Sequence, residues 1–201
     1  MALTSPVLAE GLRRIAAHMD GVADELNALD GQLGDGDLGV TMTRGGRALL
    51  EVLPTLPADV GMALMACAQA VTKVSGSSYG TLLATGLMAA AKTTRGRTEV
   101  PWSETAALLR AALEAMMARG KAALGDKTVL DALGAATGAA EGKGEPAEIL
   151  AATAGAVDVA LERMRGLPCK VGRARIFGER SVGLDDPGMR AFREMLRALG
   201  A

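Results

Sequence analysis

The stretch SPVLAEGLRRIAAHMDGVADELNAL, residues 5–29, carries the clearest structural signal in the sequence. Its apolar residues recur at alternating spacings of four and three, which places them in one stripe along a helix: Leu8, Leu12, Ile15, Met19, Val22, Leu26 and Leu29. Ser5 is a favourable N-cap residue, and Pro6 stands at the first helical position, where its missing N–H costs nothing. We therefore predict a long amphipathic helix with Ser5 as its N-cap.

Comparable patterns predict seven further helices. Their expected ranges, bounded by proline, glycine and polar turns, are 40–53, 59–74, 79–93, 103–119, 127–140, 146–165 and 187–199. Ser103 is expected to cap the fifth helix, Gly120 to end it, and Asp126 to cap the sixth. The segment 166–185 is expected to be irregular. Short connections favour antiparallel neighbours, so the prediction is an all-α, up-and-down bundle of about eight helices.

Composition narrows the classes of protein to consider. No linker composition divides the 201 residues, so we expect a single domain, 1–201. Alanine occurs 39 times and hydrophobic residues make up 49% of the chain, which is typical of packed helices rather than of disorder. A net charge of -1 and 2% aromatic residues give no support for nucleic acid or an anionic membrane as the partner.

Other sequence features indicate where the protein works. We find neither an apolar run long enough to span a membrane nor a signal-peptide pattern at the N-terminus. Cys67 and Cys169 are the only cysteines and lack the CxxC spacing of metal or redox sites. They are expected to be buried or free thiols in a reducing compartment, and hence we expect a cytoplasmic protein.

The most unusual local feature is an acidic, glycine-rich segment after the first helix. Asp30, Asp35 and Asp37 fall within eight residues in DGQLGDGD, 30–37. Crowded carboxylates repel one another unless a cation neutralises them, and hard oxygen ligands without His or Cys favour Mg²⁺, Ca²⁺ or Mn²⁺. The spacing does not fit an EF-hand, because no glutamate follows at the twelfth position. A solvated turn without a metal is the alternative.

Three further segments are candidates for binding an anion. VSGSSYGT, 74–81, offers free backbone N–H groups and hydroxyls at a helix start, although an ordinary N-cap explains it equally. GDKT, 125–128, resembles a Walker A loop only superficially, because no strand precedes it. The irregular segment 166–185 contains Lys170, Arg173, Arg175 and Arg180, which suit phosphate groups, and the alternative is an exposed loop.

Histidine-dependent chemistry is excluded by composition. His18 is the only histidine, and it lies well before the acidic segment on the first helix. We expect it to be solvated. Because no second histidine is available, we expect neither a Ser-His-Asp nor a Cys-His mechanism, and no histidine-rich zinc site.

Taken in order, four segments resemble the L subunit of dihydroxyacetone kinase, the nucleotide-binding, DhaL-like family. The matching stretches are LDGQLGDGDLGVTMTRG (29–45), VSGSSYGT (74–81), RGKAALGDKTVLDAL (119–133) and GRARIFGERSVGLDDPG (172–188). The resemblance extends over nearly the whole chain. It implies an eight-helix antiparallel barrel with a nucleotide site in the loops at one end.

The same resemblance implies a ligand set. Asp30, Asp35 and Asp37 correspond to three carboxylates that bind Mg²⁺, two ions in that family, against the phosphates of ATP or ADP. The positions that correspond to nucleotide contacts are Leu38, Gly39, Val40, Thr41, Val74, Ser75, Gly120, Val129, Arg173, Asp186, Pro187 and Gly188. No catalytic residue is expected on this chain, because the family holds its ketose on a separate K subunit or domain.

The chain departs from the family at three positions. Leu38 and Leu184 stand where histidine is usual, and Thr41 stands where asparagine is common. The resemblance therefore implies a kinase subunit that phosphorylates dihydroxyacetone or a related ketose with a K-type partner, using ATP or a phosphotransferase-system donor protein. A homodimer is also compatible with it. The alternative is a catalytically weakened, nucleotide-binding regulatory module that docks a partner, and a plain helical scaffold is the third reading.

Overall fold

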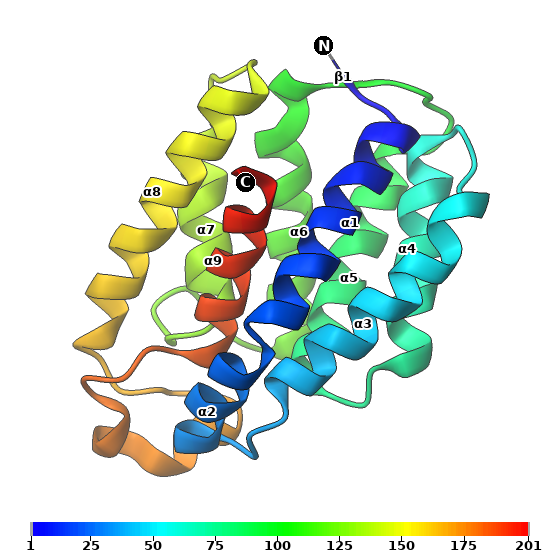
Figure 1. Ribbon diagram of the computed structural model, residues 1–201. Coiled ribbons are helices and arrows are strands. Elements are labelled where there is room, and N and C mark those ends of the chain that lie inside the picture. The colour runs from blue at the N-terminus through cyan, green and yellow to red at the C-terminus, as the bar shows by residue number, and fades with distance from the viewer. Residues whose placement is uncertain (1, 201) are drawn as a thin grey trace.

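Helices build almost the entire protein in the computed structural model, which describes residues 2–200 (Figure 1). The described chain contains α1 (Ser5–Gly21), α2 (Ala23–Leu33), α3 (Leu38–Val52), α4 (Val60–Val74), α5 (Ser78–Thr94), α6 (Thr105–Gly120), α7 (Val129–Ala140), α8 (Pro146–Arg165) and α9 (Pro187–Gly200). Short 3₁₀ helices lie at Leu53–Thr55, Trp102–Glu104 and Arg173–Ser181. None of the helices in the described chain is long and apolar enough to cross a membrane.

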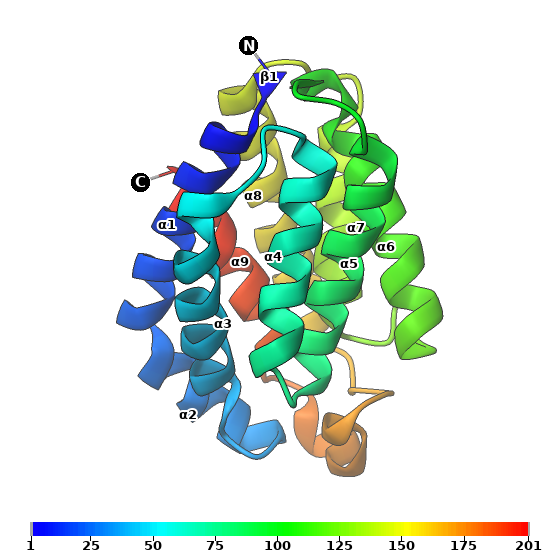
Figure 2. The same cartoon turned by 90° about the vertical axis from the view of Figure 1, so that its right-hand side faces the viewer.

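The helices form a closed ring. Each packs against the next in sequence from α3 to α9, while α1 packs against both α3 and α9. Because α2 continues α1 after a break, the ring has eight members that run alternately up and down (Figures 1 and 2). This confirms the expected all-α, eight-helix antiparallel architecture.

The break between α1 and α2 divides the helix that the sequence predicted as one. Val22 leaves helical geometry, with φ -106° and ψ 6°, and its N–H still bonds the carbonyl of His18. The N-cap is Thr4, not Ser5, since the Thr4 hydroxyl accepts a hydrogen bond from the N–H of Val7 at 3.5 Å. The apolar stripe survives the break because α2 keeps leucines facing the ring, so periodicity predicted the buried face but not the change of direction.

Two boundaries of α6 also differ from expectation. Residues 102–104 form a 3₁₀ turn, which moves the N-cap from Ser103 to Glu104. At the other end Gly120 is still helical, and Lys121 takes the left-handed conformation with φ 51°. The sequence predicted that Gly120 would end the helix, because glycine has no β-carbon and adopts the left-handed conformation without strain. In the structure Lys121 adopts that conformation instead, although its β-carbon makes it unfavourable.

A two-stranded pairing was not anticipated. Strand β1 (Ala2–Leu3) runs antiparallel to β2 (Val100–Pro101) and joins the N-terminus to the segment before α6. It lies at the end of the ring opposite α2 (Figure 1). Two residues per strand give too little periodicity for a sequence signal.

The interior of the ring is apolar. Buried side chains such as Met19, Val60, Cys67, Val157 and Met189 are at most 1% exposed. An internal cavity of about 240 Å³ is lined almost entirely by apolar groups from helices around the ring. Both free cysteines are buried, as expected. The rigid ring therefore leaves polar chemistry to its ends.

Candidate functional site

One end of the ring contains a polar cavity of about 570 Å³. Its walls come from four connections: α2 to α3, α4 to α5, α6 to α7, and the segment 166–185 between α8 and α9, here named the last loop. These connections lie together at the end marked by α2 in Figures 1 and 2. The up-and-down topology brings them to the same end, although they are far apart in sequence.

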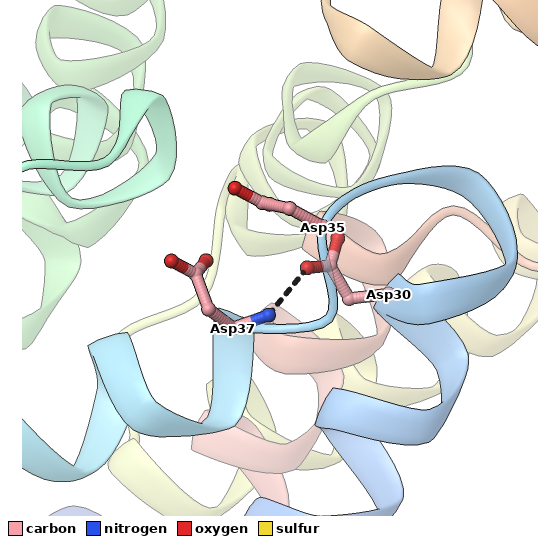
Figure 3. A group of neighbouring side chains, drawn as sticks. All are labelled: Asp30, Asp35 and Asp37. Atoms are coloured by element: carbon pink, nitrogen blue, oxygen red, sulfur yellow. Dashed lines mark hydrogen bonds between the residues drawn. The ribbon is translucent and has the colours of Figure 1, made fainter.

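Three carboxylates lie close together where α2 ends and α3 begins: Asp30 is in the last turn of α2, Asp35 is in the connection and Asp37 is the N-cap of α3 (Figure 3). One oxygen from each of Asp30, Asp35 and Asp37 lies within 4.8 Å of the others. The N–H of Asp37 donates to Oδ2 of Asp30 at 3.0 Å, which fixes the turn. Asp37 is the N-cap residue of α3, yet its side chain makes no capping hydrogen bond. Its carboxylate is therefore available to a ligand.

This donor set fits a hard divalent cation. Mg²⁺ binds oxygen at about 2.1 Å, so oxygens on opposite sides of one ion are about 4.2 Å apart. The ligand oxygens lie within 4.8 Å of one another, a separation that one such ion could bridge. The three side chains are partly or fully exposed, which allows substrate oxygens to complete the coordination.

Glycines make the turn around these carboxylates possible. A β-carbon on Gly34 would lie 2.6 Å from Oδ1 of Asp30, and one on Gly39 would lie 2.0 Å from the carbonyl oxygen of Ala23. Gly36 has φ +76°, a conformation that side chains disfavour. The glycine pattern that the sequence showed thus lets α3 start directly beside α2.

Four helix N-termini converge on the cavity. Residues in the first turns of α3, α5, α7 and α9 all line it. At the start of α5 the hydroxyl of Ser77 accepts from the N–H of Gly80 at 3.1 Å. The helix dipole places partial positive charge at each N-terminus, although side-chain caps already accept some of the first N–H groups, as Asp186 does from Met189 N in α9. Together they favour a polyanionic ligand.

The α6–α7 turn is held rigid by its own side chains. Thr128 caps α7, and its hydroxyl accepts from Leu130 N at 3.2 Å. The carboxylate of Asp131 accepts two hydrogen bonds, from Gly125 N at 2.5 Å and from Thr128 N at 2.9 Å. Asp126, which the sequence favoured as the cap, instead accepts from Ala123 N. The cap moved because this turn extends two residues further than the sequence indicated.

Two arginines bring positive charge to the cavity. Arg173 from the last loop forms an ion pair with Asp35, so it bridges the last loop and the α2–α3 connection. Arg119 at the end of α6 also lines the cavity. A cavity with three carboxylates, two guanidinium groups and four helix N-termini can bind a metal and an anion side by side.

A carboxyl group at the floor of the cavity has unusual electrostatics. Burial raises the pKa of Asp186 to about 7, and the carboxylate of Asp131 acts in the same direction. Burial also raises the pKa of Tyr79, whose hydroxyl is buried without a hydrogen-bond partner. An unpaired buried hydroxyl in a cavity wall is an available hydrogen-bonding group for a ligand.

The structure brings most of the candidate residues together. Those that line the cavity are Asp30, Asp35, Asp37, Leu38, Thr41, Gly120, Val129, Arg173, Asp186, Pro187 and Gly188. The others are close in sequence but do not line it: Gly39 and Val40 follow in α3, Val74 is exposed, and Ser75 faces the inner apolar cavity.

Sequence reasoning did not single out several lining residues. Arg119, Ser77, Ser78 and Tyr79 contribute to the wall. All four lie inside the quoted segments 74–81 and 119–133, so the motifs contained the signal. Identifying the individual residues required knowing which side of each turn faces the cavity.

His18 is only partly solvated, with 32% of its side chain exposed, because it has a protein partner that the sequence did not indicate. Its Nε2 lies 2.9 Å from Oε2 of Glu194, a carboxylate with 4% side-chain exposure, across the contact between α1 and α9. Arg197 lies 3.0 Å from the other carboxylate oxygen. The sequence did not indicate this partner because α9, which is remote in sequence, covers this side of α1. His18 does not line the end cavity.

Comparison with known proteins places this arrangement in a family. A sequence model of the DAK2 domain matches residues 32–201. The chain belongs to the DAK2 domain family. This DAK2 domain is DhaL-like, being 28% identical to the "PEP-dependent dihydroxyacetone kinase, ADP-binding subunit DhaL" of Escherichia coli (strain K12) across 99% of this chain and 97% of that one.

Larger proteins contain the same unit. The DAK2 domain is 34% identical to the human "Triokinase/FMN cyclase", covering 94% of this chain and 33% of the human protein. It thus spans about a third of the length of that relative. The dihydroxyacetone kinase from C. freundii, solved with AMP-PNP and Mg²⁺, superposes with a TM-score of 0.77 at 25% identity, over 99% of this chain and 34% of that one. These relatives are kinases or kinase subunits.

Proposed function

We propose that this DAK2 domain binds a magnesium–adenine nucleotide in the end cavity and acts as the phosphoryl-transfer unit of a dihydroxyacetone-kinase-like enzyme. A separate K-type subunit holds the small ketose acceptor. The observation that carries the proposal is the meeting of Asp30, Asp35 and Asp37 with Arg173 and four helix N-termini in one cavity. The E. coli relative's name as an ADP-binding kinase subunit supports it.

The residues have separate tasks in this proposal. Asp30, Asp35 and Asp37 hold Mg²⁺, which supplies charge neutralisation for phosphoryl transfer. The first turns of α3 and α5 donate N–H groups to phosphate oxygens. Arg173 pairs with phosphate from the opposite wall, while Gly120 and Val129 border the space for the base. The chain thus binds and orients, and the acceptor comes from the partner.

Calorimetric titration tests the nucleotide site. ADP should bind much more tightly with Mg²⁺ than without it, because the carboxylates repel phosphate in the absence of a cation. Asp35→Asn should weaken Mg-ADP binding at least about tenfold, since it removes one negative ligand and keeps the shape, a loss of about 1.4 kcal/mol. Asp20→Asn is the matched control, because Asp20 is exposed on α1 and does not line the cavity. Equal ADP affinity with and without Mg²⁺ would contradict the proposal.

Turnover tests the division of labour. The chain alone should not phosphorylate dihydroxyacetone at a useful rate, because no acceptor-binding nucleophile is expected in the cavity and proximity to a held acceptor is worth about 7–11 kcal/mol. Adding a cognate K-type subunit should restore ADP release with trioses or tetroses. Ketose-dependent turnover by the single chain would refute this assignment. Parallel reactions with ATP and with a phosphotransferase-system donor protein distinguish the two sources of phosphate.

One observation favours a second function. Leu38, where histidine is usual in the family that this chain resembles, is 6% exposed and lines the cavity beside the carboxylates. The only histidine of the chain is paired with Glu194 elsewhere. A nucleotide-binding regulator that docks a partner without turnover would need the metal site but no histidine. Tight Mg-ADP binding with no turnover in the presence of a K-type subunit would favour this function.

A further inference from the structure

A lysine is buried beside the cavity without lining it. Lys127 lies in the α6–α7 turn and is 1% exposed, the largest fully buried side chain of the described residues. Burial lowers the pKa of its ammonium group, whereas the nearby carboxylates of Asp185 and Asp186 act in the opposite direction. A buried charge is costly unless its donors are satisfied. A lysine without a structural role in a turn would normally extend its side chain into solvent.

The partners of the ammonium group are backbone carbonyls. Lys127 Nζ donates to the carbonyl oxygens of Leu167 at 2.7 Å and Ser181 at 2.8 Å, with that of Arg165 at 3.5 Å. Arg165 ends α8 and Leu167 is the second residue of the last loop, whereas Ser181 ends the 3₁₀ helix within that loop. One side chain therefore holds both ends of the last loop, which are 14 residues apart in sequence from 167 to 181.

Further hydrogen bonds join the same two ends around Lys127. The Ser181 hydroxyl accepts from Cys169 N at 2.8 Å and donates to the carbonyl of Gly178 at 2.6 Å. Lys170 N donates to the carbonyl of Asp126 at 3.2 Å, and Gly183 N to that of Arg165 at 2.8 Å. The ends of the last loop are thus fixed to the α6–α7 turn. Between them the loop extends to Arg173, which reaches the acidic cluster.

The backbone of Lys127 is itself in an unusual conformation. Its φ is +61°, in the left-handed region that non-glycine residues rarely adopt. The next residue, Thr128, is the N-cap of α7, and Val129 lines the cavity. Backbone strain and a buried charge in one residue are both unfavourable to stability, and such features persist where the surrounding site requires them.

We propose that Lys127 is a positioning residue of the nucleotide site, whose ammonium group fixes the last loop so that Arg173 stands over the acidic cluster. This inference rests on the proposed function. Lys127 itself touches neither the carboxylates nor the cavity. It acts through Arg173, which pairs with Asp35, and its ammonium group bonds backbone carbonyls rather than any of the three aspartates.

The test compares Lys127→Met, Lys127→Arg and the control Lys92→Met, which removes an exposed lysine from the last turn of α5. Lys127→Met should weaken Mg-ADP binding about tenfold or more, while Mn²⁺ binding without nucleotide should not weaken, because the variant removes no ligand and can only loosen the pairing of Arg173 with Asp35. Lys127→Arg should recover most of the affinity, because a guanidinium group also donates to several carbonyls. Lys92→Met should bind as the wild type does.

A double-mutant cycle separates positioning from general stability. If Lys127 acts through Arg173, Lys127→Met should cost little more in an Arg173→Ala background, so the two effects should not add. Additive losses, or unchanged Mg-ADP affinity in Lys127→Met, would overturn the inference. If Lys127→Met does not fold, Lys127→Gln, which keeps two N–H donors but no charge, enters the same cycle.

Hydrogen exchange of the nucleotide-free protein tests the positioning role of Lys127 separately from the proposed nucleotide binding. Amides of residues 167–183 should lose protection in Lys127→Met without any nucleotide, whereas those of α3 to α5 keep it. If the wild type fails to bind Mg-ADP, the proposed function is wrong even where this loss is seen. If it binds Mg-ADP and the loop stays equally protected in the variant, the positioning role alone is wrong.

Discussion

Replacing Asp186 by asparagine should make the protein more stable at neutral and alkaline pH. The carboxyl oxygen Oδ2 accepts from Met189 N at 2.8 Å at the start of α9, and an asparagine oxygen can accept the same bond. The substitution therefore removes the charge and keeps the cap. The wild-type carboxylate is disfavoured chiefly because it is buried, and secondly because Asp131 is near.

The size of the effect follows from the pKa of Asp186, which rises from 3.8 to about 7 on folding. Each pKa unit corresponds to 1.36 kcal/mol, so about three units set a ceiling of about 4 kcal/mol. Asp186 is partly exposed, and solvent reduces this to about 2 kcal/mol. Between pH 4 and 7 the folded state holds a proton that the unfolded state has lost. Stability from this group is therefore complete below pH 4 and is lost as the pH rises through 7.

Urea unfolding at pH 4, 6 and 8, followed by circular dichroism, measures the difference between the variant and the wild type. Asp186→Asn should exceed the wild type by about 2 kcal/mol at pH 8 and by almost nothing at pH 4. Asp20→Asn, an exposed carboxylate on α1, should differ from the wild type by less than about 0.5 kcal/mol at each pH. A gain at pH 8 that persists undiminished at pH 4 would refute the reasoning.

Three further substitutions or treatments have defined outcomes. Gly39→Ala should lower the free energy of unfolding by about 1–3 kcal/mol in urea titrations, because its β-carbon would lie 2.0 Å from the Ala23 carbonyl oxygen. An unchanged free energy of unfolding would mean that the close approach of α2 and α3 is not needed for stability. Cys67 and Cys169 should not react with a thiol reagent at pH 8 until the protein is unfolded, since burial raises the pKa of both thiols; rapid labelling of native protein would contradict their burial. Glu194→Ala should cost about 1–3 kcal/mol in the same titrations, because it removes the carboxylate shared by His18 and Arg197, both of which are partly exposed. A loss below about 0.5 kcal/mol would contradict a stabilising role for this contact.

Local patterns predicted where most of the helices lie and the proximity of the three aspartates. Asp30, Asp35 and Asp37 are close in sequence, and the glycines between them make a tight turn, so their proximity follows from the chain itself. The helix Pro146–Arg165 has the predicted bounds because proline opens it and glycine follows it. In both cases the forces that decide the structure lie within a few residues.

Contacts between distant segments could not be read in the same way. The pairing of Arg173 with Asp35 joins residues from opposite ends of the chain, and the pairing of His18 with Glu194 does so again. The burial of Lys127 could not be predicted either, because a lysine in a polar turn is usually exposed to solvent and this one is 1% exposed. The up-and-down ring brings every second connection to the same end. Which polar side chains meet there follows from that arrangement and not from local sequence.

The contact between α1 and α9 has a consequence for how the protein acquires its shape. His18 and Glu194 are 176 residues apart, and joining them costs about 1.5 kcal/mol more chain entropy than closing a loop of about 35 residues between neighbouring helices. We therefore expect helices that are neighbours in sequence to pack against each other first, which gives an open ring. The contact between α1 and α9 then closes the ring last. A nascent chain on the ribosome would carry the aspartates long before it received the arginine that faces them. Until α9 arrives, an early intermediate would expose the apolar edges of α1 and α8 to water and to other chains.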